Sequence, residues 1–153
     1  MLEIEIPQRE ALVLHNAVFD INGTLAVDGL PIPGAIDQLQ QLSGHLSIHL
    51  LTAGTHGNMD ILRDIFGFPL RQIQTGEDKV RFVQQLGASG VVAFGNGAND
   101  AGMLQAAALG IAVLTEEGIA TRALQAADVL AYGPLNAIDL LLHPKRLIAT
   151  LRP

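Results

Sequence analysis

The stretch Ala17-Val18-Phe19-Asp20-Ile21-Asn22-Gly23-Thr24-Leu25 decides the fold of this chain. Residues 17–19 are apolar and predict the end of a buried strand, and Asp20 stands where that strand meets a turn that contains glycine. In open α/β sheets, ligands bind at the carboxyl ends of the strands, so Asp20 is the first candidate for a catalytic residue. Asn22 occupies the position at which a second carboxylate would give a hydrolase its general acid/base, and its amide neither takes nor gives that proton.

Outward from this stretch, strand-like and helix-like segments alternate to the end of the chain. Hydrophobic periodicity predicts helices at 34–43, 57–66, 77–86, 99–108, 117–126 and 134–151, and strands at 16–20, 46–51, 69–74, 90–94, 110–114 and 127–131. Repeated β–α alternation implies a parallel sheet with helices on both faces. We therefore predict an α/β fold with a three-layer, doubly wound, mostly parallel sheet, formed by one domain over residues 1–153.

Two short hairpins complete this prediction. Segments 2–6 and 11–14 flank a polar turn and predict an N-terminal hairpin at the edge of the sheet. Residues 26–33 contain an Asp-Gly turn and two prolines, which predicts a small hairpin or flap. The flap is too short to be a domain, so we expect no cap domain over the site.

The composition excludes several functional classes. Hydrophobic residues make up 49% of the 153 residues and charged residues 16%, which argues against disorder. The net charge of -6 and the lack of a Lys/Arg run disfavour a nucleic-acid or anionic-membrane surface. The chain has no cysteine, no signal-peptide pattern and no apolar run of about 18 residues that would span a membrane. These features predict a cytoplasmic protein without disulfides or thiolate metal sites.

Polar residues follow three of the predicted strands. They are Asp20 after the first strand, Thr52 after the second, and Asn96 with Asn99-Asp100 after the strand at 90–94. Because the carboxyl ends of parallel strands meet at one edge of a sheet, we expect these residues to converge. Polar residues after strands are also ordinary turn formers and helix caps, and Asp100 alone would suit a helix N-terminus. The conjunction of three such positions favours a functional site.

The full set of motifs resembles the haloacid dehalogenase-like superfamily of phosphotransferases. The motifs are Asp20-Ile21-Asn22-Gly23-Thr24-Leu25, then Leu50-Leu51-Thr52-Ala53-Gly54, then Lys79, then Gly95-Asn96-Gly97-Ala98-Asn99-Asp100. Their order and spacing fit the family over essentially the whole chain. The first and last motifs look closest to the phosphorylation domain of P-type ATPases, and the chain resembles a compact, stand-alone, soluble version of that domain.

The resemblance implies a role for each of these residues. Asp20 would attack a phosphoryl group and form an aspartyl-phosphate, with Thr52 bonding a phosphoryl oxygen and Lys79 balancing the charge. The catalytic set would be Asp20, Asn22, Thr52 and Lys79. Phosphate would be bound by Gly23, Thr24, Ala53, Gly54 and Asn99, partly through backbone N–H groups. Magnesium would be held by Asp20, the main-chain carbonyl of Asn22, Asn96 and Asp100.

Two departures from the family pattern concern catalysis and metal binding. Phosphatases of the family usually have Asp where Asn22 stands, and general acid/base catalysis is worth about 10²–10⁴-fold, so we predict slow hydrolysis or a persistent aspartyl-phosphate. P-type ATPases carry Thr at that position and also lack the acid, so phosphoryl transfer remains possible. Asn96 stands where the family usually places an Asp ligand, and with one charge less the metal should bind more weakly.

The lack of a cap leaves the partner of the site open. Capless relatives act on large partners or use a neighbouring subunit as a lid, so the substrate would be a phosphorylated small molecule or a phosphoprotein. The apolar flap residues Val27, Leu30 and Ile32 either support a homo-oligomer that supplies the cap or fold back on their own sheet. His56 follows the Thr52 loop and is a further candidate to approach the substrate.

We therefore predict a magnesium-dependent phosphohydrolase or phosphotransferase that acts slowly through Asp20. The competing hypothesis is a non-enzymatic phosphate- or metal-binding or regulatory oligomer built on a silenced site. A third hypothesis keeps the enzyme but gives it a nucleotide as substrate, as the resemblance to P-type ATPases suggests. The nucleotide-binding domain of those pumps is absent between Thr24 and Thr52.

Overall fold

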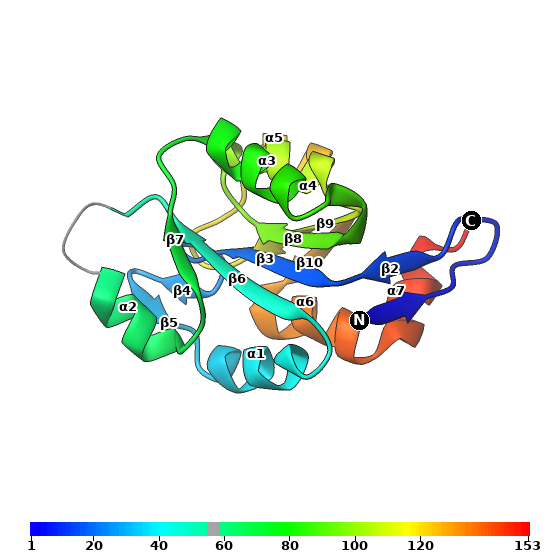
Figure 1. Cartoon of the computed structure of the whole chain (residues 1–153). Coiled ribbons are helices and arrows are strands. Elements are labelled where there is room, and N and C mark those ends of the chain that lie inside the picture. Colours follow the sequence, from blue (N-terminus) through cyan, green and yellow to red (C-terminus); the bar gives the residue numbers. More distant parts are fainter. Residues whose placement is uncertain (55–58) are drawn as a thin grey trace.

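A parallel six-stranded sheet forms the centre of the protein in a computed structural model that describes residues 1–54 and 59–153. The strand order is β10-β9-β8-β3-β6-β7 (Figure 1). The strands are β3 (Asn16–Asp20), β6 (Ser47–Thr52), β7 (Leu70–Gln72), β8 (Val91–Gly95), β9 (Leu109–Leu114) and β10 (Val129–Tyr132). The predicted doubly wound α/β fold is thereby confirmed, and every pair of neighbouring strands in this sheet is parallel.

Helices cover both faces of the sheet (Figure 1). One face carries α3 (Gly76–Gln85), α4 (Ala101–Ala106) and α5 (Thr121–Ala126), and the other carries α1 (Ala35–Ser43), α2 (Met59–Phe66), α6 (Gly133–Leu142) and α7 (Pro144–Leu151). The 3₁₀ turns η1 (Ala88–Gly90) and η2 (Ala98–Asp100) precede β8 and α4. Each layer has its own buried aliphatic cluster, which is how a chain with 4% aromatic residues fills its core.

Two predicted helices differ from the structure more than the others do in their boundaries. The stretch predicted as one helix at 134–151 forms α6 and α7, because Pro144 lacks an N–H group and begins a new helix instead of continuing the first. The helix predicted at 117–126 begins only at Thr121, because the preceding residues form a loop that contacts the site.

The N-terminal hairpin is present, but the prediction that it lies at the edge of the sheet is wrong. β1 (Leu2–Ile4) and β2 (Leu12–Leu14) pair with each other as a separate two-stranded sheet. β2 leads directly into β3, and β3 is a central strand because its apolar residues are buried between β6 and β8. The edges of the main sheet are β10 and β7.

The predicted flap is the antiparallel pair β4 (Ala26–Val27) and β5 (Leu30–Pro31). Within the described residues this hairpin is what separates the Asp20 turn from α1, so no cap domain stands there. Ile32 packs against the core and Val27 is half-buried, whereas Leu30 at the tip is 71% exposed. The flap thus folds back at its base and leaves one large apolar side chain in solvent.

The register of the central strands places the site. Phe19 lies opposite Leu50 of β6 and Phe94 of β8, and the rings of Phe19 and Phe94 stack at 4.1 Å. Asp20 therefore emerges from the most buried part of the sheet, beside the ends of β6 and β8. No helix in the described part of the chain is long and apolar enough to cross a bilayer.

Candidate active site

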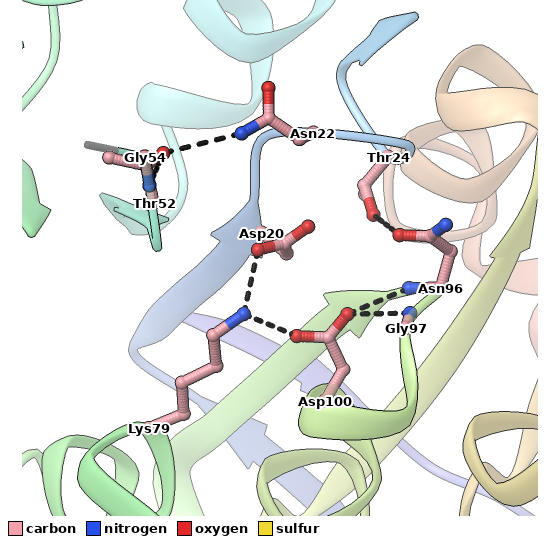
Figure 2. Close-up of polar contacts among 9 residues, drawn as sticks. All are labelled: Asp20, Asn22, Thr24, Thr52, Gly54, Lys79, Asn96, Gly97 and Asp100. Atoms are coloured by element: carbon pink, nitrogen blue, oxygen red, sulfur yellow. Dashed lines mark hydrogen bonds and ion pairs between the residues drawn. The ribbon is translucent and has the colours of Figure 1, made fainter. Parts of the chain in front are cut away.

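A buried network of two carboxylates and one ammonium lies at the carboxyl end of β3 (Figure 2). Nζ of Lys79 donates to Oδ1 of Asp20 at 2.7 Å and to Oδ1 of Asp100 at 2.6 Å. Asp20 is 6% exposed, and Lys79 and Asp100 are fully buried. The structure thus brings Asp20, Asp100 and Lys79 into direct contact, and Lys79 is the residue of the three that only the family resemblance had named.

Local sequence explains how Lys79 and Asp100 reach this point. A capping box of Thr75 and Asp78 fixes the start of α3, and Lys79 then faces the sheet from the first turns of that helix. Gly95 ends β8, and a Cβ there would lie 2.5 Å from Cγ of Asp100. A side chain at position 95 would thus displace the carboxylate that holds Lys79.

The charges in the network shift each other's pKa. Burial, followed by the negative charge of Asp100, raises the pKa of the Asp20 carboxyl group from 3.8 to about 7, although the Lys79 ammonium lowers it. Burial lowers the pKa of Lys79, but the Asp20 and Asp100 carboxylates outweigh burial and raise it above its ordinary value. Lys79 therefore stays charged, and the cluster carries one more carboxylate than it has cations.

Thr52 and Asn22 face each other across the loop that follows Asp20 (Figure 2). Thr52 is the last residue of β6 and is fully buried. Its Oγ1 accepts hydrogen bonds from the Gly54 N–H at 3.1 Å and from Nδ2 of Asn22 at 3.4 Å. Because Oγ1 is the acceptor in both bonds, the hydroxyl hydrogen of Thr52 can be donated to a ligand oxygen.

Asn96 connects three loops of the site. Its Oδ1 accepts from the Thr24 hydroxyl at 3.3 Å, and its Nδ2 donates to the Gly118 carbonyl at 3.3 Å. Oδ2 of Asp100 accepts from the N–H groups of Asn96 at 3.0 Å and of Gly97 at 2.8 Å. The loop after β8 is therefore held in a fixed conformation by Asp100.

The predicted phosphate-binding groups are not all free to bind a ligand. The N–H groups of Gly23 and Thr24, predicted to form part of an anion cradle, instead donate inside the turn to the carbonyls of Ala26 and Ile21. A Cβ on Gly23 would lie 2.3 Å from Nδ2 of Asn96, so this glycine is needed for a close approach. Ala53, Gly54 and Asn99 also flank the site, with Ala53 and Asn99 exposed. His56 lies outside the described residues.

Sequence reasoning missed the loop between β9 and α5. Thr115 is buried, and its hydroxyl donates to the Gly23 carbonyl at 2.8 Å across 92 positions of sequence. The Ala120 N–H donates to the Asn96 carbonyl at 2.8 Å, so the loop is bonded to both motif loops. One signal was available: Thr115 is a polar residue directly after a predicted strand, as Thr52 is.

The donor set fits a magnesium ion. The second carboxylate oxygen of Asp20 points away from Lys79 toward the turn of Asn22 and Thr24 (Figure 2), where the Asn96 amide oxygen also lies. These are oxygen donors, and the excess negative charge of the cluster favours a cation. No group of three or more His, Cys, Asp or Glu side chains within residues 1–54 and 59–153 forms a metal cage. Magnesium commonly binds through few carboxylates and several waters.

Sequence comparisons relate this chain to an uncharacterized protein. No family model matches the chain. An uncharacterized protein of Methanocaldococcus jannaschii is 40% identical over 62 residues, which are 40% of this chain and 67% of that protein, and the chain belongs to the same family as that protein.

Solved structures identify the fold. The magnesium-, phosphate- and KDO-bound 3-deoxy-D-manno-octulosonate 8-phosphate phosphatase of Moraxella catarrhalis superimposes with a TM-score of 0.67 at 17% identity, over 91% of this chain and 87% of that chain. The cobalt-bound deoxy-D-mannose-octulosonate 8-phosphate phosphatase of Haemophilus influenzae gives 0.69 at 13%, over 87% and 90%. A zinc-transporting PIB-type ATPase in its E2.Pi state gives 0.65 at 24%, over 78% of this chain and 20% of the pump. These similarities establish the haloacid dehalogenase-like fold predicted from the motifs.

Proposed function

We propose that this chain, which has the haloacid dehalogenase-like fold, is a magnesium-dependent phosphohydrolase with Asp20 as its nucleophile. The observation that carries the proposal is the buried Asp20 carboxylate, paired with Lys79 at the carboxyl end of the central strand. A buried carboxylate with a strongly raised pKa and a specific cationic partner is typical of functional sites rather than of surface ion pairs.

The reaction would begin with attack on the substrate phosphorus. An oxygen of the Asp20 carboxylate forms a bond to phosphorus, the bond to the leaving-group oxygen breaks, and that oxygen keeps the electron pair and takes a proton from water. The Thr52 hydroxyl donates to a phosphoryl oxygen, and Lys79 holds Asp20 in place and offsets negative charge. Water then hydrolyses the aspartyl-phosphate and releases inorganic phosphate and free Asp20.

Bound magnesium would supply positive charge between the Asp20 carboxylate and the phosphoryl oxygens, two anions that otherwise repel each other. Asp20, the carbonyl of Asn22 and the amide oxygen of Asn96 would hold the metal. Both oxygens of Asp100 already accept hydrogen bonds from the protein, so Asp100 adds charge near the metal and orients Lys79 and the Asn96 loop.

The proposed substrate is a phosphorylated small molecule, the class that the names of the two neighbouring octulosonate 8-phosphate phosphatases indicate for those proteins. The flap alone leaves the site open to water, so a second copy of the chain would serve as the lid for a small substrate, whereas a phosphoprotein substrate would cover the site itself. Asn22 cannot protonate the leaving group, and the proposed rate is therefore low.

A second candidate function is phosphate binding at a silenced site. The observation that favours it is the pair of amides, Asn22 and Asn96, at positions where carboxylates would exchange protons and hold metal. In that case the protein would bind beryllofluoride or phosphate with magnesium but would release no product.

The similarity to the zinc-transporting ATPase favours a nucleoside triphosphate as the first alternative substrate to assay.

The deciding experiment compares the wild-type protein with Asp20→Asn. With magnesium, the wild-type protein is expected to hydrolyse p-nitrophenyl phosphate, and Asp20→Asn is expected to lose at least about 10³-fold of that activity because no nucleophile remains. Beryllofluoride should bind the wild-type protein in the presence of magnesium and should not bind the variant. Equal hydrolysis rates for the two proteins would sink the proposal, and beryllofluoride binding without turnover would favour the silenced site.

A further inference from the structure

A small cavity lies at the carboxyl edge of the sheet, beside the turn that follows Asp20. Its volume is about 210 Å³, and it is lined by Ile32 at the base of the flap, by the ends of β9 and β10, and by the first turn of α6. Ile32 and Leu135 both pack against the core cluster on the face of the sheet that carries α1 and α6. The cavity therefore lies on that face, away from the helix that carries Lys79.

Two of the residues that line the cavity are hydrogen-bonded to the turn that follows Asp20. The Thr115 hydroxyl donates to the Gly23 carbonyl at 2.8 Å. The Ile32 N–H donates to the Leu25 carbonyl at 2.9 Å. β9 is the second strand from β3, and neighbouring strands lie about 4.8 Å apart, so the cavity begins roughly 10 Å from Asp20 along the edge of the sheet. A substrate whose phosphoryl group meets Asp20 can therefore place its other end in the cavity.

The floor of the cavity is apolar, and its mouth carries a carboxylate. Leu114 and Leu135 are half-buried and Pro134 is buried, whereas Glu116 and Tyr132 are exposed. Among the described residues that line the cavity, Glu116 alone has a charged side chain. A pocket of this kind favours an uncharged apolar group and repels an anionic one.

The volume of the cavity fits a single ring. An apolar protein cavity of about 150 Å³ binds benzene, so a volume of about 210 Å³ holds one six-membered ring with a small substituent. The cavity is open at the mouth formed by Glu116 and Tyr132, through which the ring would remain joined to the phosphoryl group.

Asn22 favours the same class of leaving group for an independent reason. Its amide cannot protonate the oxygen that departs from phosphorus, so a leaving group that is stable as an anion reacts best. A phenol ionises with a pKa near 10, whereas an alkyl alcohol ionises close to water, whose pKa is about 15.7. A phenolate therefore departs far more readily than an alkoxide from a site without an acid.

We propose that the cavity binds the leaving group of the substrate, and that this substrate is an aryl phosphate, the phosphate monoester of a phenol with one uncharged ring. The inference rests on the proposed function, because it names the substrate class of the same site. The ring lies against Leu114 and Leu135, and Glu116 at the mouth disfavours substrates that carry a second anionic group.

Steady-state kinetics with magnesium test the fit of the ring. For each protein, kcat/KM for 4-methylphenyl phosphate is divided by kcat/KM for acetyl phosphate, which is too short to reach the cavity, so that a general loss of Asp20 chemistry cancels. Leu135→Phe fills the cavity and should lower this ratio about tenfold. Leu140→Phe is the matched control, because Leu140 is a half-buried residue of the same helix that packs against the same core, and it should keep the wild-type ratio.

The charge at the mouth is tested separately with 4-carboxyphenyl phosphate. Glu116→Lys replaces repulsion by attraction and should raise the ratio of kcat/KM for 4-carboxyphenyl phosphate to that for 4-methylphenyl phosphate about fivefold. Glu117→Lys makes the same change in net charge at the neighbouring exposed residue, and it should keep the wild-type ratio.

The two ratios together decide the assignment. It is supported if Leu135→Phe and Glu116→Lys change their ratios as stated and the two controls do not. A wild-type ratio in either of these variants overturns it, as does an equal change in the matched control. Failure of the proposed function is distinguishable, because Asp20→Asn would then hydrolyse acetyl phosphate as fast as the wild-type protein, which would overturn both.

Discussion

The two ends of the central strand β3 differ, because one borders a surface cleft and the other carries the buried ion pairs of the candidate active site. At the amino end, Asn16 borders a cleft of about 640 Å³ that is also lined by His15, His45 and His49. At the carboxyl end, Asp20 meets Lys79 in a buried ion pair. The polar groups that line the cleft at the amino end are exposed or half-buried, whereas the other end holds charges that are almost fully buried. Buried charge, more than cavity size, marks the site.

The largest effect is expected from Lys79→Met. Removing the ammonium leaves Asp20 and Asp100 as two buried carboxylates without a cation, and breaking a buried pair in this way destabilises proteins by about 3–5 kcal/mol. Hydrolysis should be lost as well. Urea denaturation of the wild-type protein and of the variant measures the difference in the free energy of unfolding.

The matched change at the amino end is Asn16→Ala, which removes one neutral, partly buried hydrogen bond to His49 and should cost about 0.5–1.5 kcal/mol. A cost for Lys79→Met no larger than that for Asn16→Ala would contradict the contrast between the two ends.

The next largest effect is expected from Asn22→Asp. An acid at position 22 can protonate the leaving group, so hydrolysis of an alkyl phosphate, whose leaving group needs that proton, should rise by about 10²-fold. Hydrolysis of p-nitrophenyl phosphate should rise much less, because nitrophenolate leaves without a proton. The ratio of the two rates is the measurement, and an equal gain on both substrates would show that the new carboxylate acts in some other way.

A third comparison uses the two glycines that bracket β8. Gly95→Ala places a Cβ 2.5 Å from Cγ of Asp100, whereas Gly90→Ala places one 3.0 Å from the ring of the exposed His15. Overpacking at a buried position costs about 1–3 kcal/mol, so Gly95→Ala should destabilise the protein by that amount and also lower activity through Lys79. His15 can rotate away, so Gly90→Ala should retain full activity. Loss of activity in both variants would argue against a specific role for Asp100.

The fold was predictable because the local hydrophobic periodicity of each β–α unit indicates its strand and its helix. The motifs identified the residues that converge. Asp20, Thr52, Lys79 and Asp100 were named from the sequence, and the structure brings them to one edge of the sheet. The position of the N-terminal hairpin was not predictable, since alternation within a strand does not say which sheet the strand joins.

The bond that Thr115 makes was not predictable either, although its position after a strand marked it as a candidate. It joins segments far apart in sequence, since Thr115 donates to the Gly23 carbonyl. Local periodicity carries no information about such contacts. The single-domain organisation, the cytoplasmic location and the oligomeric state remain predictions.

The last prediction concerns the pH dependence of stability without magnesium, which should have opposite signs at the two ends. The pKa of Asp20 is raised from 3.8 to about 7, mainly by burial, so the folded protein keeps a proton over a range in which the unfolded chain has lost it. The free energy of unfolding should therefore fall as the pH rises from about 4 to about 7. Asp20→Asn removes this loss and should be more stable than wild type above pH 7, with little difference near pH 4.

His49 should give the opposite pH dependence of stability. Burial and the positive charge of Arg71 lower the pKa of His49 below its ordinary value of 6.5, so the unfolded chain binds a proton that the folded protein resists. Stability is then lost as the pH falls below about 6.5, and His49→Gln, which can keep a hydrogen bond to Asn16, should gain on wild type at pH 5 and not at pH 8. Urea unfolding in EDTA across this range measures both slopes. If the two variants gained stability at the same end of the range, the burial of Asp20 would not be what raises its pKa, and the contrast between the two ends of β3 would fail.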